Sequence, residues 1–185
     1  LGRIDANGRV FLVNPQGVYF GGGAKVETAG FAASALAIGD ADFMQGNYVF
    51  TKPAGAGLGE IRNEGEIHAD QFAVLIGDHV RNEGLVSARL GTVALAAGSR
   101  VSLQLDDSGL VNFSVDEATL AAQAGVENLG ALVADGGRVL MTAKVADGLV
   151  ATAVNNNGLV RAQGIAEHGG EILLVGAGGS VVNTG

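Results

Sequence analysis

The stretch Ile61-Arg62-Asn63-Glu64-Gly65-Glu66-Ile67-His68-Ala69 contains the pattern on which most of the sequence is built. Its central glycine is preceded by an asparagine two positions earlier and by an apolar residue four positions earlier. An apolar residue follows two positions later, and an alanine four positions later. Apolar residues at alternate positions lie on one face of a β-strand. The stretch therefore predicts two short strands joined by a tight corner at Asn63-Glu64-Gly65.

The same pattern recurs along the chain. Gly109 is interpreted as a degenerate copy, with Asp107 in place of the asparagine, and Gly30 as a fainter one. A second pair of apolar residues follows nine and eleven positions after several of the glycines, as in Val74 and Ile76. Matches at so many fixed offsets identify an internal repeat. The asparagines of the clear copies are Asn63, Asn82, Asn128, Asn156 and Asn183, each two residues before Gly65, Gly84, Gly130, Gly158 and Gly185.

Repeats of about 20 to 28 residues, rich in short β-runs and glycine corners, are typical of a parallel β-helix, or β-solenoid. Each repeat would form one rung of the coil, and equivalent apolar residues would stack inside it. The five asparagines would form a ladder at one corner, because an amide can donate to one copy of itself and accept from another. The glycines would supply the positive φ that a corner can require. We therefore expect an all-β fold.

Two stretches interrupt the repeat. Residues 39–59 carry a short apolar strand, Asn47-Tyr48-Val49-Phe50, and are expected to form a flap or side hairpin outside the coil. Residues 116–124 begin with Asp116, a favourable N-cap, followed by alanine-rich helix formers, and they predict a short helix. One further helical turn or two is expected within residues 142–153.

Composition narrows the classes of partner and chemistry. The chain has 185 residues and a formal net charge of −8, which argues against nucleic acid because phosphates require clustered Lys and Arg. Aromatic residues make up only 5% of the chain, so the core is expected to consist of Val, Leu, Ile and Ala. The chain has no cysteine, which excludes thiol chemistry. The absence fits either a cytosolic protein or a chain that crosses an oxidising periplasm.

Parallel β-helices also include polysaccharide lyases and glycosidases, which need clustered carboxylates on an external face. The candidate pairs, Asp40 with Asp42 and Asp106 with Asp107, lie in loop-like stretches and are interpreted as solvated turns. We therefore expect no catalytic residue, no metal site and no cofactor. The histidines do not have the spacing of metal ligands: His68, His79 and His168.

A second motif, Asn14-Pro15-Gln16-Gly17, lies between the apolar runs Val10–Val13 and Val18–Phe20. Asparagine suits the first position of a type I turn, proline presets φ at the second, and glycine suits the fourth. The motif therefore predicts a tight corner that joins consecutive strands of an early rung.

The segment from Ala6 to Gly21, ANGRVFLVNPQGVYFG, resembles the core of the haemagglutination-activity domain of filamentous haemagglutinin-like exoproteins. These are the secreted partners of two-partner secretion systems in Gram-negative bacteria. The family's motif reads Asn-Pro-Asn-Gly, and Gln16 replaces its third residue while keeping the turn chemistry. The resemblance continues through residues 30–34, 46–50 and the Asn-x-Gly rungs. The family's opening cap and an earlier Asn-Pro-Asn-Leu element are absent, so residues 1–185 are expected to be a single β-helix domain from a longer exoprotein.

The resemblance implies a right-handed coil and a role as the secretion-recognition domain and folding nucleus of a large adhesin. It also implies export through the periplasm and outer membrane, to the cell surface or the medium, by an outer-membrane transporter with periplasmic domains. A host or biofilm carbohydrate or receptor would be bound by the passenger. The turn at Asn14 would act mainly through its structure, with direct recognition by the transporter as the other possibility. The alternative function is a carbohydrate-binding or carbohydrate-active β-helix.

Overall fold

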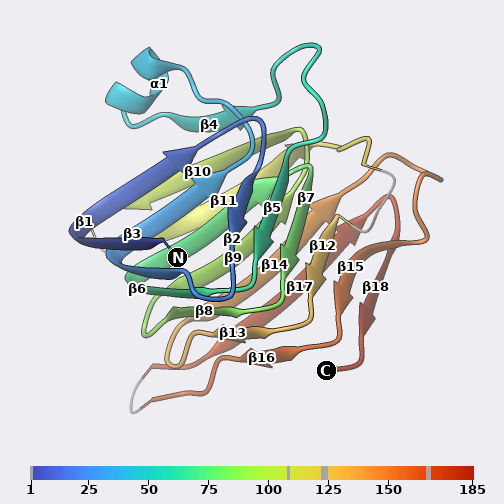
Figure 1. Cartoon of the computed structure of the whole chain (residues 1–185). Coiled ribbons are helices and arrows are strands. Elements are labelled where there is room, and N and C mark those ends of the chain that lie inside the picture. Colours follow the sequence, from blue (N-terminus) through green and yellow to red (C-terminus); the bar gives the residue numbers. More distant parts are fainter. Residues whose placement is uncertain (1, 108, 122–124, 166–167) are drawn as a thin grey trace.

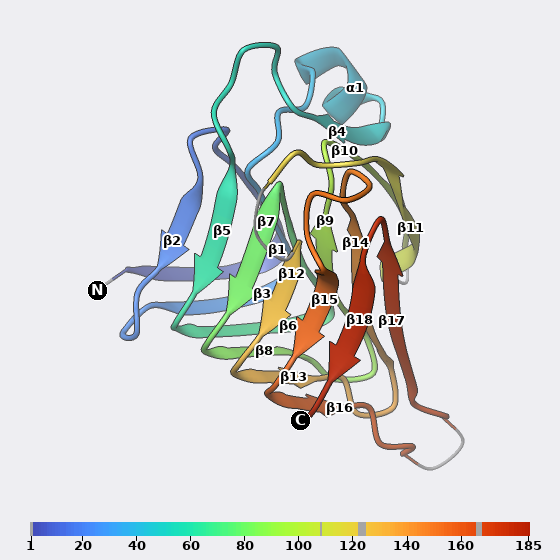
Figure 2. The same ribbon diagram turned by 90° about the vertical axis from the view of Figure 1, so that its right-hand side faces the viewer.

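Short strands from successive rungs stack in parallel in the computed structural model, which describes residues 2–107, 109–121, 125–165 and 168–185. One face of the coil is a six-stranded parallel sheet, and Figure 2 shows its strands in a row. In spatial order these strands are β2 (Val18–Phe20), β5 (Glu60–Asn63), β7 (His79–Asn82), β12 (Val126–Asn128), β15 (Thr152–Asn156) and β18 (Ser180–Asn183).

A nine-stranded parallel sheet forms the other two faces. Its long strands β1 (Arg3–Val13), β3 (Lys25–Ser34) and β6 (Glu66–Gly77) run across both faces. The first half of β6 pairs with β8, and its second half pairs with β9. The later rungs divide between the two faces, which confirms the predicted all-β parallel β-helix. One face continues with β8 (Leu85–Ala88), β13 (Ala131–Val133) and β16 (Leu159–Arg161), the other with β9 (Thr92–Ala97), β14 (Arg138–Lys144) and β17 (Glu171–Ala177).

The inside of the coil is filled by ladders of aliphatic side chains. Ile61, Val80, Val126 and Val154 occupy the same position in four successive rungs, and all four are fully buried. Alternate residues of each strand point inward, so the period-two pattern of the sequence corresponds to the core.

No helix among the described residues is long and apolar enough to cross a membrane.

A second, smaller core lies outside the coil. Strands β4 (Tyr48–Thr51), β10 (Arg100–Asp106) and β11 (Gly109–Glu117) form an antiparallel sheet in the order β11-β10-β4. Phe50 and Val101 of this sheet pack with the outward-facing Phe72 and Val74 of β6. The second half of β6 and the whole of β9 are therefore buried on both sides, which explains their continuous apolar runs.

The flap that leaves the coil at residues 39–59 contains the helix α1 (Asp40–Met44) as well as β4. Figure 1 shows both at one end of the molecule, where β4 forms the edge of the antiparallel sheet next to β10. The ring of Phe11 from β1 stacks on Tyr48 at 5.1 Å and meets Phe43 of α1 edge-on at 5.1 Å. The packing of these three rings holds the flap against the first rung.

The predicted rung corner at Gly109 is wrong. Gly109 lies at the turn of the antiparallel hairpin β10–β11, where it has a φ of +134°. The hairpin is an insertion between β9 and β12, so β7 pairs directly with β12 although 46 residues separate Asn82 from Asn128. The turn residues of a hairpin resemble those of a rung corner, because both require Asx and Gly.

The short helix predicted at residues 116–124 is also wrong for the part that the structure describes. Asp116 lies in β11, and its carboxylate accepts hydrogen bonds from Ser102 (2.6 Å) and Ser114 (2.7 Å) instead of capping a helix. Thr119 forms an isolated parallel bridge with Val145, and residues 122–124 lie outside the described residues. Strand pairing has overridden the weak intrinsic preference of this segment for helix.

The helical turn expected within residues 142–153 is absent from that stretch of the described structure. Strand β14 continues to Lys144, a turn closed by a hydrogen bond from Leu149 N to Ala146 O (3.1 Å) follows, and β15 begins at Thr152. The helical insertion of the described residues is α1, in the flap.

The corner asparagines form a continuous hydrogen-bonded ladder inside the coil. Each side-chain Nδ2 donates to the Oδ1 of the asparagine one rung further on. Asn63, Asn82 and Asn128 have no exposed surface, so the ladder satisfies polar groups that have no access to water. The donor–acceptor distances are 2.8 Å from Asn63 to Asn82, 2.8 Å from Asn82 to Asn128, 2.7 Å from Asn128 to Asn156 and 2.7 Å from Asn156 to Asn183.

The corner glycines serve a different purpose from the one expected. None of them is among the glycines with positive φ, so the predicted conformational reason is wrong. A Cβ added to Gly65 would lie 2.6 Å from Ala24 O. At Gly84 and Gly130 the added Cβ would overlap the carbonyl oxygen of the corner glycine one rung earlier. Glycine is required because consecutive rungs approach closely at this corner.

One buried carboxylate joins the extra segments to the coil. Asp78, in the corner between β6 and β7, is 1% exposed. Its oxygens accept hydrogen bonds from Gly59 N (2.8 Å) and Thr119 Oγ1 (2.8 Å), and Lys52 Nζ lies 2.8 Å away. The charge is fully satisfied by groups from the base of the flap and from the segment after β11.

The ladder predicts the effect of replacing a central asparagine. Asn82→Leu removes an acceptor from Asn63 and a donor from Asn128, so we expect the free energy of unfolding to fall by about 1–3 kcal/mol. Asn183→Leu, at the exposed end of the ladder, is the matched control and should lower it by less than about 1 kcal/mol. Urea denaturation measures both losses. Equal losses would show that the ladder does not stabilise the coil.

Two buried threonines should respond oppositely to the same substitution. The Thr28 hydroxyl is buried and has no hydrogen-bond partner among the described residues, and the equivalent rung positions hold Ala69 and Ala88. Thr28→Val should therefore raise the free energy of unfolding by about 1 kcal/mol. Thr119→Val removes the hydrogen bond to Asp78 and should lower it by about 1–3 kcal/mol. Changes of the same sign in urea denaturation would contradict this account.

Candidate functional site

The motif Asn14-Pro15-Gln16-Gly17 forms a hydrogen-bonded turn between β1 and β2. Gly17 N donates to Asn14 O (2.9 Å), which closes the turn. The Asn14 side chain braces it twice, because Nδ2 donates to Gly17 O (2.9 Å) and Oδ1 accepts from Gln16 N (3.1 Å). Asn14 N donates to Ser34 O (2.9 Å), so the turn is also tied to the next rung.

The last residue of the turn has to be glycine. Gly17 has a φ of +103°, a conformation that residues with a Cβ rarely adopt. A Cβ at this position would also lie 2.9 Å from Glu60 O, at the start of β5. Gln16 contributes only its backbone N–H to the turn, and its side chain is exposed. The third position can therefore change from Asn to Gln without loss of turn geometry.

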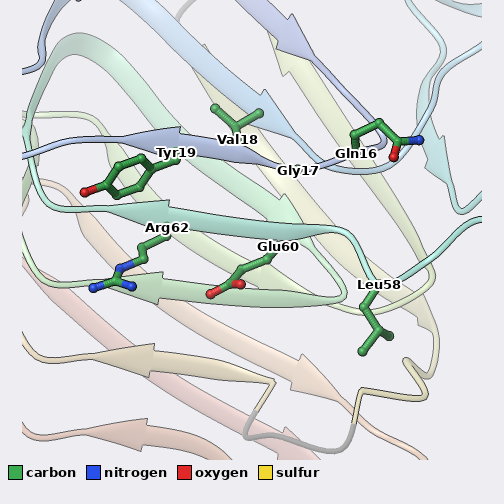
Figure 3. A pocket seen from close by; sticks show the side chains of 7 residues that line it. All are labelled: Gln16, Gly17, Val18, Tyr19, Leu58, Glu60 and Arg62. Atoms are coloured by element: carbon green, nitrogen blue, oxygen red, sulfur yellow. The ribbon is translucent and has the colours of Figure 1, made fainter. Parts of the chain in front are cut away.

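The turn borders a shallow pocket on the outside of β2 and β5, with a volume of about 470 Å³. Figure 3 shows Tyr19 on β2, Glu60 and Arg62 on β5, and Leu58 on the adjoining end of the flap. Tyr19 is 62% exposed and Leu58 is 54% exposed, so apolar surface is available to a partner next to the turn. Within the described residues, β2 has a paired neighbour on one side only, namely β5.

A network of charged groups extends from this surface across the six-stranded sheet. Tyr19 Oη donates to Glu64 (2.6 Å), and this hydrogen bond raises the pKa of Tyr19 above its usual value. Arg62 pairs with Glu64 (2.6 Å) and Glu83 (3.0 Å). Arg81 hydrogen-bonds Glu83 (2.8 Å) and thereby lowers the pKa of that carboxyl. Glu127, at 2.8 Å from Arg81, ends the network on β12.

The carboxylate pairs considered for catalysis do not converge. Asp42 of α1 accepts a hydrogen bond from Asn47 (2.9 Å), and Asp40 lies in the same exposed helix. Asp106 and Asp107 lie at the β10–β11 turn, where their carbonyl oxygens accept from Arg9. Both pairs thus belong to separate turns or termini on the surface.

The three histidines are also far from forming one site. His68 Nδ1 lies 2.7 Å from Ser87 Oγ, His79 is buried at the start of β7, and His168 pairs with Ile165 in an isolated bridge. Among the residues that the structure describes, no group of three or more His, Asp or Glu side chains is arranged to hold a metal ion.

Two features of the site were not singled out from the sequence. The first is the pocket beside the turn, which is lined by Tyr19 and Leu58 although these residues lie 39 positions apart in the sequence. The second is Asp78, which anchors the flap. Its one signal in the sequence is a carboxylate directly after the apolar run 72–77.

The chain has relatives among known proteins. It is 35% identical over 151 residues to a heme/hemopexin-binding protein of Haemophilus influenzae (strain ATCC 51907 / DSM 11121 / KW20 / Rd), covering 77% of this chain and 16% of that protein. A second heme/hemopexin-binding protein of Haemophilus influenzae is 30% identical over 196 residues, covering 94% of this chain and 20% of that protein. The chain thus spans about a fifth or less of the length of these relatives.

A solved structure has the same fold over the whole chain. The crystal structure of the HMW1 secretion domain from Haemophilus influenzae matches with a TM-score of 0.82 and 30% sequence identity, covering 100% of this chain and 47% of that one. A family model, the TPS secretion domain, matches residues 1–185. Both the family model and the solved structure are thus described as secretion domains. With its parallel β-helix and its turn between β1 and β2, the chain belongs to the TPS secretion domains, the export domains of two-partner-secreted exoproteins.

Proposed function

We propose that this domain directs the export of a large, filamentous haemagglutinin-like adhesin of a Gram-negative bacterium and nucleates its folding outside the cell. The observation that carries the proposal is the braced turn at Asn14, which sets the corner between the strands of the first rung in a chain of the TPS secretion family. That the rest of the exoprotein acts as an adhesin is part of the same proposal. The names of the relatives describe heme and hemopexin binding by those whole proteins.

The partner of a TPS secretion domain is its transporter in the outer membrane. We infer that the periplasmic domains of the transporter bind early strands of the chain by strand addition. In this mode, main-chain hydrogen bonds supply affinity and side-chain pockets supply specificity. Strand β2 is the candidate for this contact, because it directly follows the braced turn and carries the exposed Tyr19, which lines a pocket together with Leu58.

The other end of the coil supports a role in nucleating further rungs. Ile172 of β17 and Val181 of β18 occupy core positions of their rung, yet they are 48% and 40% exposed. Asn183 accepts from Asn156, and its own amide nitrogen is available to donate to a further rung. Stacking on this end would bury apolar side chains and extend the ladder, so each rung templates the next.

The hydrogen bonds within the motif bear on whether it acts through its structure or is recognised directly by the transporter. Both ends of the Asn14 amide are engaged within the turn, and Gly17 contributes backbone conformation. Among the polar side chains of the motif, the exposed Gln16 is the one that makes no hydrogen bond within the described residues. This favours a structural role for the motif over direct recognition by the transporter. For the alternative of a carbohydrate-active β-helix, the separated carboxylate pairs offer no catalytic arrangement.

The double variant Asn14→Ala/Pro15→Ala tests the proposal. Loss of the side-chain braces and of the preset φ should lower the free energy of unfolding by about 1–3 kcal/mol and slow folding. The full-length protein should then accumulate in the periplasm or be degraded there, instead of reaching the medium or cell surface. Asn7→Ala, at an exposed position of β1, is the control and should leave folding and export unchanged.

The outcomes separate the two roles of the motif. Loss of both stability and export supports the structural role. Normal folding with failed export would instead assign the motif to direct recognition. Export at the level of the unmodified protein would remove the turn from the account of secretion.

A further inference from the structure

A second pocket, with a volume of about 540 Å³, lies between α1 and the outward face of β4 and β10. Its lining residues belong to the flap, to the segment that leads into it and to β10, and none of them lines the pocket beside the turn at Asn14. Val49, Ile38 and Pro53 give it an apolar wall, and Asp42, Thr51 and Arg100 give it polar groups. Its volume is in the range of small-molecule sites.

Arg100 differs from the other charged residues that line this pocket. It is only partly exposed, and its guanidinium has no ion-pair or hydrogen-bond partner among the described residues. Its backbone is fixed in β10 between Thr51 of β4 and Glu117 of β11. A partly buried guanidinium without a partner is costly and calls for an explanation. The chain carries a formal net charge of −8, so acidic side chains outnumber basic ones, and a cation in a pocket without an acidic partner is unexpected.

The other charged groups of the pocket leave a defined set of free atoms. Lys52 lies 2.8 Å from the buried Asp78, so its charge is already balanced. Asp42 Oδ1 accepts from Asn47 (2.9 Å), and the second carboxylate oxygen stays available as an acceptor. The pocket therefore offers the planar donor fork of Arg100, one carboxylate acceptor and the Thr51 hydroxyl.

We propose that this pocket binds a small hydroxylated carboxylate of the size of a uronic acid. The guanidinium fork matches a carboxylate with two parallel hydrogen bonds, which a lysine could not supply. Hydroxyl groups of the ligand would donate to Asp42 and exchange hydrogen bonds with Thr51, and its carbon frame would pack on Val49 and Ile38. This binding activity is separate from the role in export and would persist if that role were disproved.

The experiment is a titration of the protein with D-glucuronate at constant ionic strength, followed by two-dimensional ¹H–¹⁵N NMR. A ligand of this size should bind with a dissociation constant of about 1 mM and shift the resonances of Gly39, Thr51 and Arg100. D-Glucose, which lacks the carboxylate, and acetate, which lacks the hydroxyls, should bind at least about tenfold more weakly.

Arg100→Gln should weaken glucuronate binding about ten- to a hundredfold, because a charge-assisted pair of hydrogen bonds is lost. Arg100→Lys keeps the charge without the fork and should give an intermediate loss. Arg3→Gln is the control, since Arg3 pairs with Asp5 and Glu27 on β1 and β3, and it should bind as the unmodified protein does. The proposal is overturned if Arg100→Gln binds glucuronate normally, or if glucose or acetate binds as tightly as glucuronate.

Discussion

The coil depends on a polar interaction buried inside an apolar core, the hydrogen bond that passes from one corner asparagine to the next. A primary amide in such a place is costly unless its donors and its acceptor are all satisfied. Here Nδ2 of Asn82 meets Oδ1 of Asn128, and Oδ1 of Asn82 meets Nδ2 of Asn63, only when the rungs are stacked in register. The aliphatic ladders supply most of the burial, but their Val, Ile and Ala side chains discriminate poorly between registers. A shift by two residues would keep aliphatic side chains inside the coil but would separate each amide from its partners, so the asparagines select the alignment among these registers.

The same constraint explains where the fold accepts insertions. The corner that carries the ladder has two intervening residues after Asn63, Asn82, Asn128 and Asn156, as between β5 and β6 or β7 and β8. The first rung, in which Phe20 takes the position of the asparagine, has four residues between β2 and β3. Each amide bonds both its own corner and the next, and the corner glycine touches the previous rung, so an added residue would break several contacts at once. The corner that follows β6, β9 and β14 has no fixed length. It ranges from the single Asp78 between β6 and β7 to the whole stretch 98–125 between β9 and β12. The flap and the hairpin both leave the coil on this side, where they pair with each other and cover β6 and β9.

This division also separates what could be predicted from the sequence from what could not. The rungs with Asn63, Asn82, Asn128 and Asn156 were predictable, because their spacing around the corner is enforced by local chemistry. The sequence pattern predicts a rung in place of the hairpin, because Asp107 and Gly109 satisfy the same turn requirements. The helix predicted at 116–124 is wrong for the described residues 116–121, because the pairing of β11 with β10 outweighs a weak local preference. The pairing of β4 with β10 links residues about 50 positions apart, and no local pattern encodes such a contact. The turn at Asn14 was predictable in its backbone, whereas the surface beside it arises from residues that only the coil brings together.

Native-state hydrogen exchange of the asparagine side-chain amides, followed by NMR, tests most directly whether the ladder holds the coil together. If it does, the NH₂ groups of Asn63, Asn82 and Asn128 will exchange as slowly as the backbone amides of β6 and β9, because both open only when rungs separate. The amide of Asn183, at the exposed end, will exchange rapidly and serves as the internal reference. Rapid exchange of all five side-chain amides while the backbone of β6 and β9 stays protected would contradict the account, since the coil would then hold its register without the ladder.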